Sequence, residues 1–178
     1  MPRLFVAIDL PEEIKERLTP LCCGLPGARW VAPEQLHLTL RFIGDVDSTV
    51  FRDVREALAG VRSDGFRLRL EGMGFFPPRG KPRVVWVGVP RSDQLLRLRN
   101  RVESALVAAG LEPEGRKYAP HITLARLKNT PAGKVGDFLA RNGLFMTGEF
   151  PVTAFFLYSS VLNTKGAKHY IEEAYPLQ

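Results

Sequence analysis

Apolar and polar residues alternate in seven stretches of the chain, and these stretches are rich in β-branched and aromatic side chains. A two-residue period of this kind predicts strands with one buried and one more polar face. The predicted strands cover residues 4–10, 36–44, 66–76, 83–89, 121–127, 150–162 and 169–177.

Four other stretches carry apolar residues at the three-to-four spacing of an amphipathic helix. They cover residues 11–21, 48–61, 92–110 and 134–143. Ser48 and Ser92 are expected as N-caps, while Gly60, Gly110 and Gly143 lie at or just past the expected helix ends. The chain therefore mixes strands and helices along its whole length.

The order of these elements repeats, and so does a tetrapeptide. "HLTL" begins at His37 and "HITL" begins 84 positions later at His121, while Phe150 follows Phe66 by the same 84 positions. The two copies thus align without a gap between these anchors. We predict an α+β fold that is bilobal and duplicated, with two pseudo-twofold-related lobes of mainly antiparallel sheet, helices on the outside and a central cleft.

The domain organisation follows from the same repeat. No linker rich in Ser, Gly or charge separates the copies, so we expect residues 1–178 to form a single bilobal domain. The first motif lobe is expected around residues 37–76 and the second around residues 121–160.

Composition narrows the class of protein. The 178 residues are 45% hydrophobic and 25% charged, which is ordinary for a soluble globular protein. No apolar run approaches the roughly 20 residues of a membrane span, and acidic residues follow the N-terminus too soon for a signal peptide. We therefore expect a cytoplasmic protein without a membrane partner.

Cysteine content and charge add two further indications. Cys22 and Cys23 are adjacent and do not make a disulfide framework, which favours a reducing compartment and leaves a redox or metal role as a minor alternative. The net charge of +6 and the pI near 9.6 favour a polyanionic partner, nucleic acid above all.

Each repeated tetrapeptide pairs a histidine with a threonine two residues on, and residues at this spacing share one face of a strand. His37 with Thr39, and His121 with Thr123, would face each other across the cleft. One neutral imidazole can take a proton from water while a protonated one gives a proton to the leaving oxygen of a phosphodiester. The hydroxyls can donate to the other phosphate oxygens. No cofactor is expected, and two histidines without nearby carboxylates or thiolates predict no metal.

The structural alternative is that these histidines only stabilise their strands. A single strand histidine is more often structural, but packing does not explain why polar His and Thr recur on the same face of both copies. His169 lies outside both motifs and is interpreted as a surface or packing residue. Asp45 and Asp47 are interpreted as solvated turn residues. The basic segment 79–83 is left open between an RNA contact and an exposed loop.

Four segments resemble one family. "RWVAPEQLHLTLRFIGDV", "FPPRGKPRVVWVGV", "YAPHITLAR" and the closing "AYPL" resemble the 2H phosphoesterases, and more narrowly the RNA 2′,3′-cyclic phosphodiesterases, also called 2′–5′ RNA ligases. The resemblance runs from the first strand to the C-terminus. It implies hydrolysis of 2′,3′-cyclic phosphate ends of RNA to 2′-phosphomonoesters, and a reversible 2′–5′ joining activity that needs no nucleotide.

The resemblance also implies roles for single residues. His37 would be the proton donor to the leaving 3′-oxygen, and His121 the proton acceptor that activates water. Thr39 and Thr123 would bind phosphate oxygens. The sequence itself is nearly symmetric and does not choose between the two histidines.

Two more positions lie five residues after each histidine. The family pattern implies that Phe42 stacks on a base and that Arg126 binds near the phosphate. Strict alternation argues against both, because an odd offset points away from the histidine face, so a bulge or a strand end would have to turn them. Core packing is the alternative for Phe42.

Other functions remain open from sequence alone. The alternatives are reversible ATP-independent 2′–5′ RNA ligation, and a cyclic phosphodiesterase that acts on a small nucleotide. A third is a non-catalytic RNA- or nucleotide-binding module. The expected partner is RNA with a 2′,3′-cyclic phosphate or a 2′–5′ linkage, and the protein is expected to be a monomer.

Overall fold

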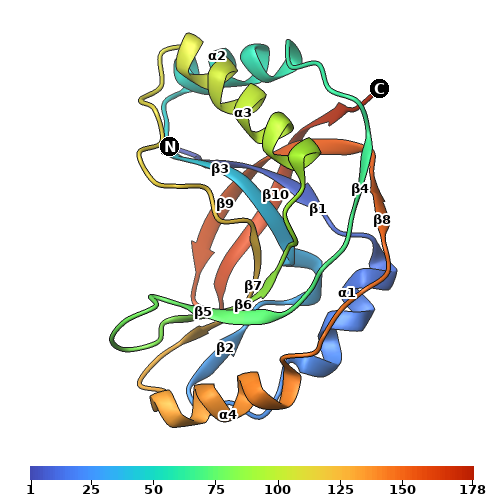
Figure 1. Cartoon of the computed structure of the whole chain (residues 1–178). Helices are drawn as coiled ribbons and strands as arrows, with labels where there is room; N and C mark the ends of the chain where they lie inside the picture. Colours follow the sequence, from blue (N-terminus) through green and yellow to red (C-terminus); the bar gives the residue numbers. More distant parts are fainter.

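The computed structural model describes residues 1–178 and contains ten strands and four α-helices (Figure 1). The strands are β1 (Arg3–Asp9), β2 (Ala28–Trp30), β3 (His37–Asp45), β4 (Phe66–Leu68), β5 (Met73–Phe76), β6 (Val84–Gly88), β7 (His121–Leu127), β8 (Phe150–Val152), β9 (Ala154–Asn163) and β10 (Gly166–Pro176). The helices are α1 (Glu12–Leu18), α2 (Ser48–Ala59), α3 (Asp93–Ala108) and α4 (Ala132–Asn142), with 3₁₀ turns at Thr19–Leu21 and Pro33–Gln35.

The strands form two four-stranded antiparallel sheets and a short ribbon. Sheet 1 has the order β10-β9-β1-β3, sheet 2 has the order β2-β7-β6-β5, and β4 pairs with β8. Helices α2 and α3 lie together on one side of sheet 1, and α4 packs against β5 of sheet 2 (Figure 1). The predicted α+β fold with antiparallel sheets is confirmed.

The strand pairing crosses the two halves of the sequence. The stretch 66–76 is not one strand but β4 and β5, broken near Gly72, whose positive φ of 74° suits glycine. The stretch 150–162 divides in the same way into β8 and β9. Strand β5 then pairs with β6 in sheet 2, and β9 pairs with β1 in sheet 1. Segment 37–76 therefore contributes strands to both sheets, β3 to sheet 1 and β5 to sheet 2.

The helix caps agree with the sequence except at one residue. Ser92 caps α3 by accepting a hydrogen bond from the Leu95 N–H at 3.2 Å. The cap of α2 is Asp47, whose carboxylate accepts from the Val50 N–H at 2.9 Å, so the prediction of Ser48 as the cap is wrong. Ser48 already lies inside the helix, and Asp47 is a capping residue rather than a solvated turn residue.

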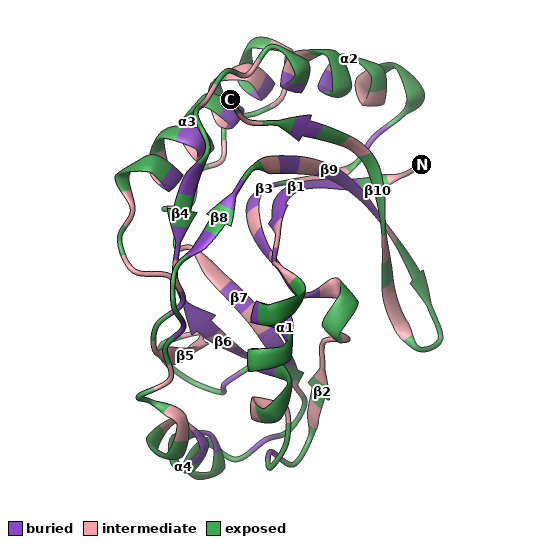
Figure 2. Ribbon diagram, turned by 90° about the vertical axis from the view of Figure 1, so that its right-hand side faces the viewer, coloured by how far each residue is buried: buried purple, intermediate pink, exposed green.

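Burial separates the two faces of sheet 1. The main core cluster holds 27 buried residues and takes Leu4, Val6 and Ile8 from the helix-facing side of β1. The alternate residues Phe5 and Ala7 point to the other side and form a separate small cluster with Tyr158. Figure 2 shows both sheets with buried positions along their strands. None of the helices is both long and apolar enough to cross a membrane.

Candidate active site

The two strands that begin with the repeated histidines lie against each other. Strand β3 is at one edge of sheet 1, and β7 of sheet 2 contacts it (Figure 2). His37 is the first residue of β3, and His121 is the first residue of β7. The fold thus brings together the two motifs that the sequence separates by 84 residues.

A β-bulge interrupts the alternation of β3. Leu40 has no partner on β1, because its neighbours Thr39 and Arg41 pair with consecutive residues of that strand. Leu40 and Arg41 are both buried, and the next residue, Phe42, returns to the face of His37. The bulge that the sequence argument required is therefore present.

Strand β7 has a bulge at the equivalent position. Leu124 has no partner on β6, because Thr123 and Ala125 pair with consecutive residues there. Both Leu124 and Ala125 are fully buried, and Arg126 returns to the face of His121. The same β-bulge, present in both copies, thus places the side chain five residues after each histidine on the face of that histidine.

Both imidazoles are anchored in the same way. The Nδ1 atom of His37 lies 2.7 Å from the carbonyl oxygen of Gln35, and the Nδ1 of His121 lies 2.7 Å from the carbonyl oxygen of Ala119. A carbonyl oxygen can only accept, so Nδ1 carries the proton in each ring. In both histidines the nitrogen that remains to exchange a proton is Nε2.

Aromatic rings support each imidazole. On sheet 1 the ring centroid of Phe5 lies 4.9 Å from that of His37 and 5.1 Å from that of Tyr158. On sheet 2 the Phe76 ring meets His121 edge-on at 5.0 Å, and the Trp86 ring lies 6.2 Å away. None of these four aromatic residues was among the residues predicted from sequence.

Burial and neighbouring charges control the protonation of His37. Desolvation is the main cause that lowers its pKa, to about 4, and the positive charges of His169 and His121 lower it further. The hydrogen bond to Gln35 and the charge of Asp9 oppose this shift. His37 is therefore neutral near pH 7 in the free protein, and it gains a proton there only if a bound anion raises its pKa.

The remaining predicted residues also lie on these two faces. Thr39 and Thr123 are half-buried, and neither hydroxyl is used in a hydrogen bond within the protein. Phe42 is 54% exposed, so the core-packing alternative for it is wrong. Arg126 is exposed. Two hydroxyls, one aromatic ring and one guanidinium are thus free to meet a ligand.

Comparison with known proteins agrees with the duplicated motif. The sequence profile described as LigT like Phosphoesterase matches residues 8–86 and again residues 87–168. The chain belongs to the LigT-like phosphoesterases. The RNA 2′,3′-cyclic phosphodiesterase of Archaeoglobus fulgidus is 36% identical over 167 residues, which cover 92% of this chain and 94% of that protein. The protein of the same name from Aeropyrum pernix is 40% identical over 147 residues, covering 80% and 82%.

A solved structure matches this LigT-like phosphoesterase over its whole length. The crystal structure of E. coli LigT complexed with 3′-AMP aligns with a TM-score of 0.81 and 30% identity, covering 100% of this chain and 99% of that one. The family resemblance inferred from the sequence is confirmed.

One histidine of this LigT-like phosphoesterase lies where the sequence did not place it. The ring of His169, on β10, meets that of His37 edge-on at a centroid distance of 5.3 Å. Its interpretation as a packing residue agrees with these ring contacts, but nothing in the sequence indicated that it packs beside His37. No sequence signal pointed to it, because β10 reaches the motif face only through its pairing with β9, which in turn pairs with β1.

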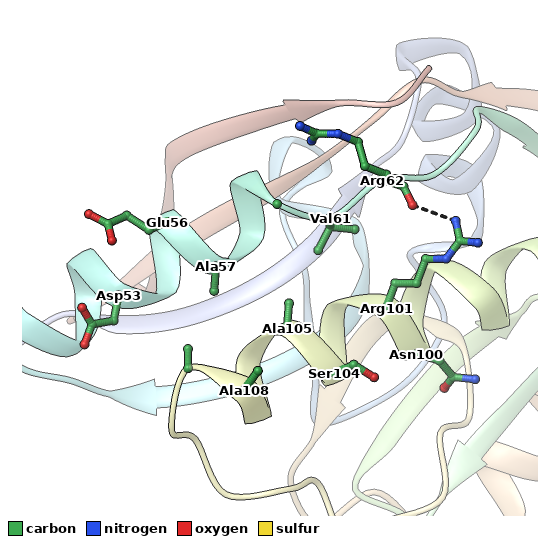
Figure 3. A pocket seen from close by; sticks show the side chains of 12 residues that line it. Asp53, Glu56, Ala57, Val61, Arg62, Asn100, Arg101, Ser104, Ala105 and Ala108 are labelled. Atoms are coloured by element: carbon green, nitrogen blue, oxygen red, sulfur yellow. Dashed lines mark hydrogen bonds between the residues drawn. The ribbon is translucent and has the colours of Figure 1, made fainter.

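One hollow of this LigT-like phosphoesterase lies away from the two motif histidines. It measures about 800 Å³ and is formed between α2 and α3, where small residues such as Ala57, Ala105 and Ala108 keep the two helices from filling the space (Figure 3). It contains no histidine. In the whole chain, no group of three or more His, Cys, Asp or Glu side chains is placed to hold a metal ion.

Proposed function

We propose that this protein hydrolyses the 2′,3′-cyclic phosphate ends of RNA to 2′-phosphomonoesters, with His37 and His121 as its acid and base. The observation that carries the proposal is the matched pair of imidazoles on β3 and β7, each with Nδ1 held by a backbone carbonyl and Nε2 free. The curated relatives from A. fulgidus and A. pernix carry the name of this activity, and the chain aligns with most of their length.

The reaction needs one proton removed and one supplied. The Nε2 of His121 accepts a proton from water as the water oxygen bonds to phosphorus. The bond from phosphorus to the 3′-oxygen breaks, and that oxygen takes a proton from Nε2 of His37. The product is a 2′-phosphomonoester with a free 3′-hydroxyl. The acid and base then regain their starting states by exchanging protons with solvent.

The low pKa of His37 sets a condition on this mechanism. With a pKa of about 4 the free imidazole is neutral at pH 7, so it acts as an acid only after the anionic diester has raised its pKa. Substrate binding and uptake of the catalytic proton are then one coupled event. Because one histidine must be charged and the other neutral, the rate should follow a bell-shaped pH profile.

Four further residues bind the substrate in this proposal. The hydroxyls of Thr39 and Thr123 donate to the non-bridging oxygens, and Arg126 offers its guanidinium to the same phosphate. Phe42 stacks on the neighbouring base, which is compatible with many sequences because every base has a flat face.

The decisive experiment is to identify the product. An oligonucleotide with a 2′,3′-cyclic phosphate is incubated with the protein in excess EDTA, and the product is examined by phosphorus NMR. We expect a 2′-phosphate and no loss of rate with the chelator. A 3′-phosphate product would contradict the assignment of the leaving oxygen, and inhibition by EDTA would contradict a metal-independent reaction.

Two alternatives use the same site. A 5′-hydroxyl in place of water would give reversible, ATP-independent 2′–5′ ligation, because the same two imidazoles can exchange roles. A cyclic phosphate on a small nucleotide would need only the histidines and threonines. Incubation of a cyclic-phosphate strand with a 5′-hydroxyl strand, and of adenosine 2′,3′-cyclic phosphate alone, separates these activities from hydrolysis of RNA ends. A non-catalytic binding module would show no turnover in any of these assays.

The proposal also covers the domain organisation, the oligomeric state, the compartment and the partner of the enzyme. We expect residues 1–178 to act as a single bilobal domain, as a monomer in the cytoplasm, with RNA as the partner. Light scattering after gel filtration measures the monomer mass, and a dimer mass would contradict this part.

A further inference from the structure

His169 differs from the two motif histidines in having no anchor. Its ring lies 4.9 Å from Phe5 and 5.3 Å from His37, both measured between centroids, and it is half-buried. The Nδ1 atoms of His37 and His121 are held by backbone carbonyls, whereas the ring nitrogens of His169 make no hydrogen bond within the protein. An imidazole with two free nitrogens therefore lies beside the ring of His37.

The charges around His169 leave room for an anion. Its ring packs against Phe5 of β1 and His37 of β3, and the charge of Arg126 on β7 reaches it. Burial, and then the Arg126 charge, lower its pKa. The carboxylate whose charge reaches His37 is Asp9, and that carboxylate is already bound by Lys15 at 3.0 Å. The cluster thus holds several groups that can become positive and no carboxylate free to balance them.

We propose that His169 binds the phosphate of the reaction product on the His37 side, by donating a hydrogen bond to a dianionic phosphate monoester. The proposal rests on the proposed function, because it uses the phosphate position between His37 and His121. A cyclic diester carries one negative charge and its monoester product carries up to two. The product therefore raises the pKa of a neighbouring imidazole more than the substrate does, and protonated His169 should hold it more tightly.

A third imidazole is present only on the sheet 1 side of the site. Strand β10 extends sheet 1 beyond β9, whereas the fourth strand of sheet 2, β2, lies at the opposite edge beside β7. No strand occupies the equivalent place beyond β5, so His121 has no third histidine next to it. His169 is thus a residue by which an otherwise symmetric site distinguishes its two sides.

The test measures binding, by calorimetry at pH 6 and pH 8. The probes are adenosine 2′-monophosphate, inorganic phosphate and adenosine 2′,3′-cyclic phosphate. We expect His169→Ala to weaken binding of the 2′-monophosphate about 10-fold at pH 6 and less than about threefold at pH 8, since the lost contact is charge-assisted only when the ring is protonated. Binding of the cyclic diester should change less than about threefold at either pH.

Two further variants separate a binding contact from packing. His169→Asn keeps an N–H donor but cannot become charged, so it should bind the 2′-monophosphate normally at pH 8 and lack the gain at pH 6. Tyr170→Ala is the matched control, because its side chain points to the other face of the same strand and should leave both affinities unchanged.

The outcomes are distinct. Inorganic phosphate should also bind His169→Ala more weakly than the wild type at pH 6; a loss confined to the nucleotide would overturn the phosphate contact. Full pH dependence in His169→Ala would assign the effect to His37 and overturn the proposal, as would full recovery in His169→Asn. If the wild type shows the binding pattern but hydrolyses no cyclic phosphate, the proposed activity fails and this contact remains.

Discussion

The two motif strands present their histidines in the same way and differ in the side chains beyond the shared motif. In β3 and in β7 the imidazole is anchored through Nδ1 to the carbonyl two residues before it, and a bulge follows at the equivalent leucine. Beyond the bulge β3 exposes the ring of Phe42, while β7 exposes the guanidinium of Arg126. The copies have kept the anchored imidazole and the bulge, and have diverged in the side chain that follows the bulge.

The largest expected effect tests whether both histidines are needed. Substitution of His37 or His121 by alanine should each lower kcat by roughly 100-fold or more, because each removes one proton transfer. The double variant should be little worse than either single variant, since the two groups act as a unit. Single-turnover kinetics on a cyclic-phosphate oligonucleotide measure this. A variant that keeps the wild-type rate would remove that histidine from the mechanism.

The second prediction distinguishes the histidine that acts as the general acid from the one that acts as the general base. A substrate with sulfur in place of the 3′-oxygen has a leaving group that needs no proton, so it should restore roughly 100-fold of the rate to His37→Ala. The same substrate should not rescue His121→Ala, which lacks the base. Rescue of His121→Ala alone would reverse the assignment of acid and base.

Alanine substitutions of Arg126 and Phe42, which lie five residues after the two motif histidines, should impair activity in different ways. Arg126→Ala removes a charged contact to phosphate and should lower kcat/KM about 10- to 100-fold, with a weaker salt dependence. Phe42→Ala removes stacking and should raise KM about 10-fold with its salt dependence unchanged. Phe42→Leu is the control for bulk without a full aromatic face. Equal salt dependence of wild type and Arg126→Ala would contradict a phosphate contact.

His37 should also make stability depend on pH. Its folded pKa of about 4 lies below the unfolded value, so its stabilising contribution is present above about pH 6.5 and is lost as the pH falls toward 4. The loss is about 1 to 3 kcal/mol, to which His169 adds in the same direction. Urea unfolding between pH 4 and pH 7 should give a flatter pH dependence for His37→Gln than for the wild type. Identical slopes would contradict the shift.

The smallest effect concerns equivalent helices of the two copies. Helix α2 has a capping carboxylate from Asp47, whereas α4 begins after Pro131 and has no side-chain cap. Asp47→Ala should therefore lower the free energy of unfolding by about 1 kcal/mol. Ser48→Ala should change it by less than about 0.5 kcal/mol, because Ser48 is not the cap. Thermal denaturation of both variants makes the comparison.

The sequence allowed prediction of what is local or repeated. Alternation and helical spacing located most elements, and the recurrence of His37 with Thr39 at His121 with Thr123 identified the paired strands. It did not allow prediction of what depends on packing between distant segments. The exchange of β5 and β9 between sheets and the position of His169 beside His37 both depend on which strand edges meet. The two β-bulges were predictable only in part. The family pattern required them, whereas strict alternation alone argued against them.

The exchange of β5 and β9 also has a consequence for the origin of the molecule. A polypeptide of half this length with the same strand pairing would have one strand without a partner and one exposed sheet edge. An exposed edge can form backbone hydrogen bonds with a strand of another chain. Two such chains would complete each other by trading strands, as in a domain-swapped dimer. The present protein has the architecture of such a dimer joined into one chain, with one motif histidine in each half.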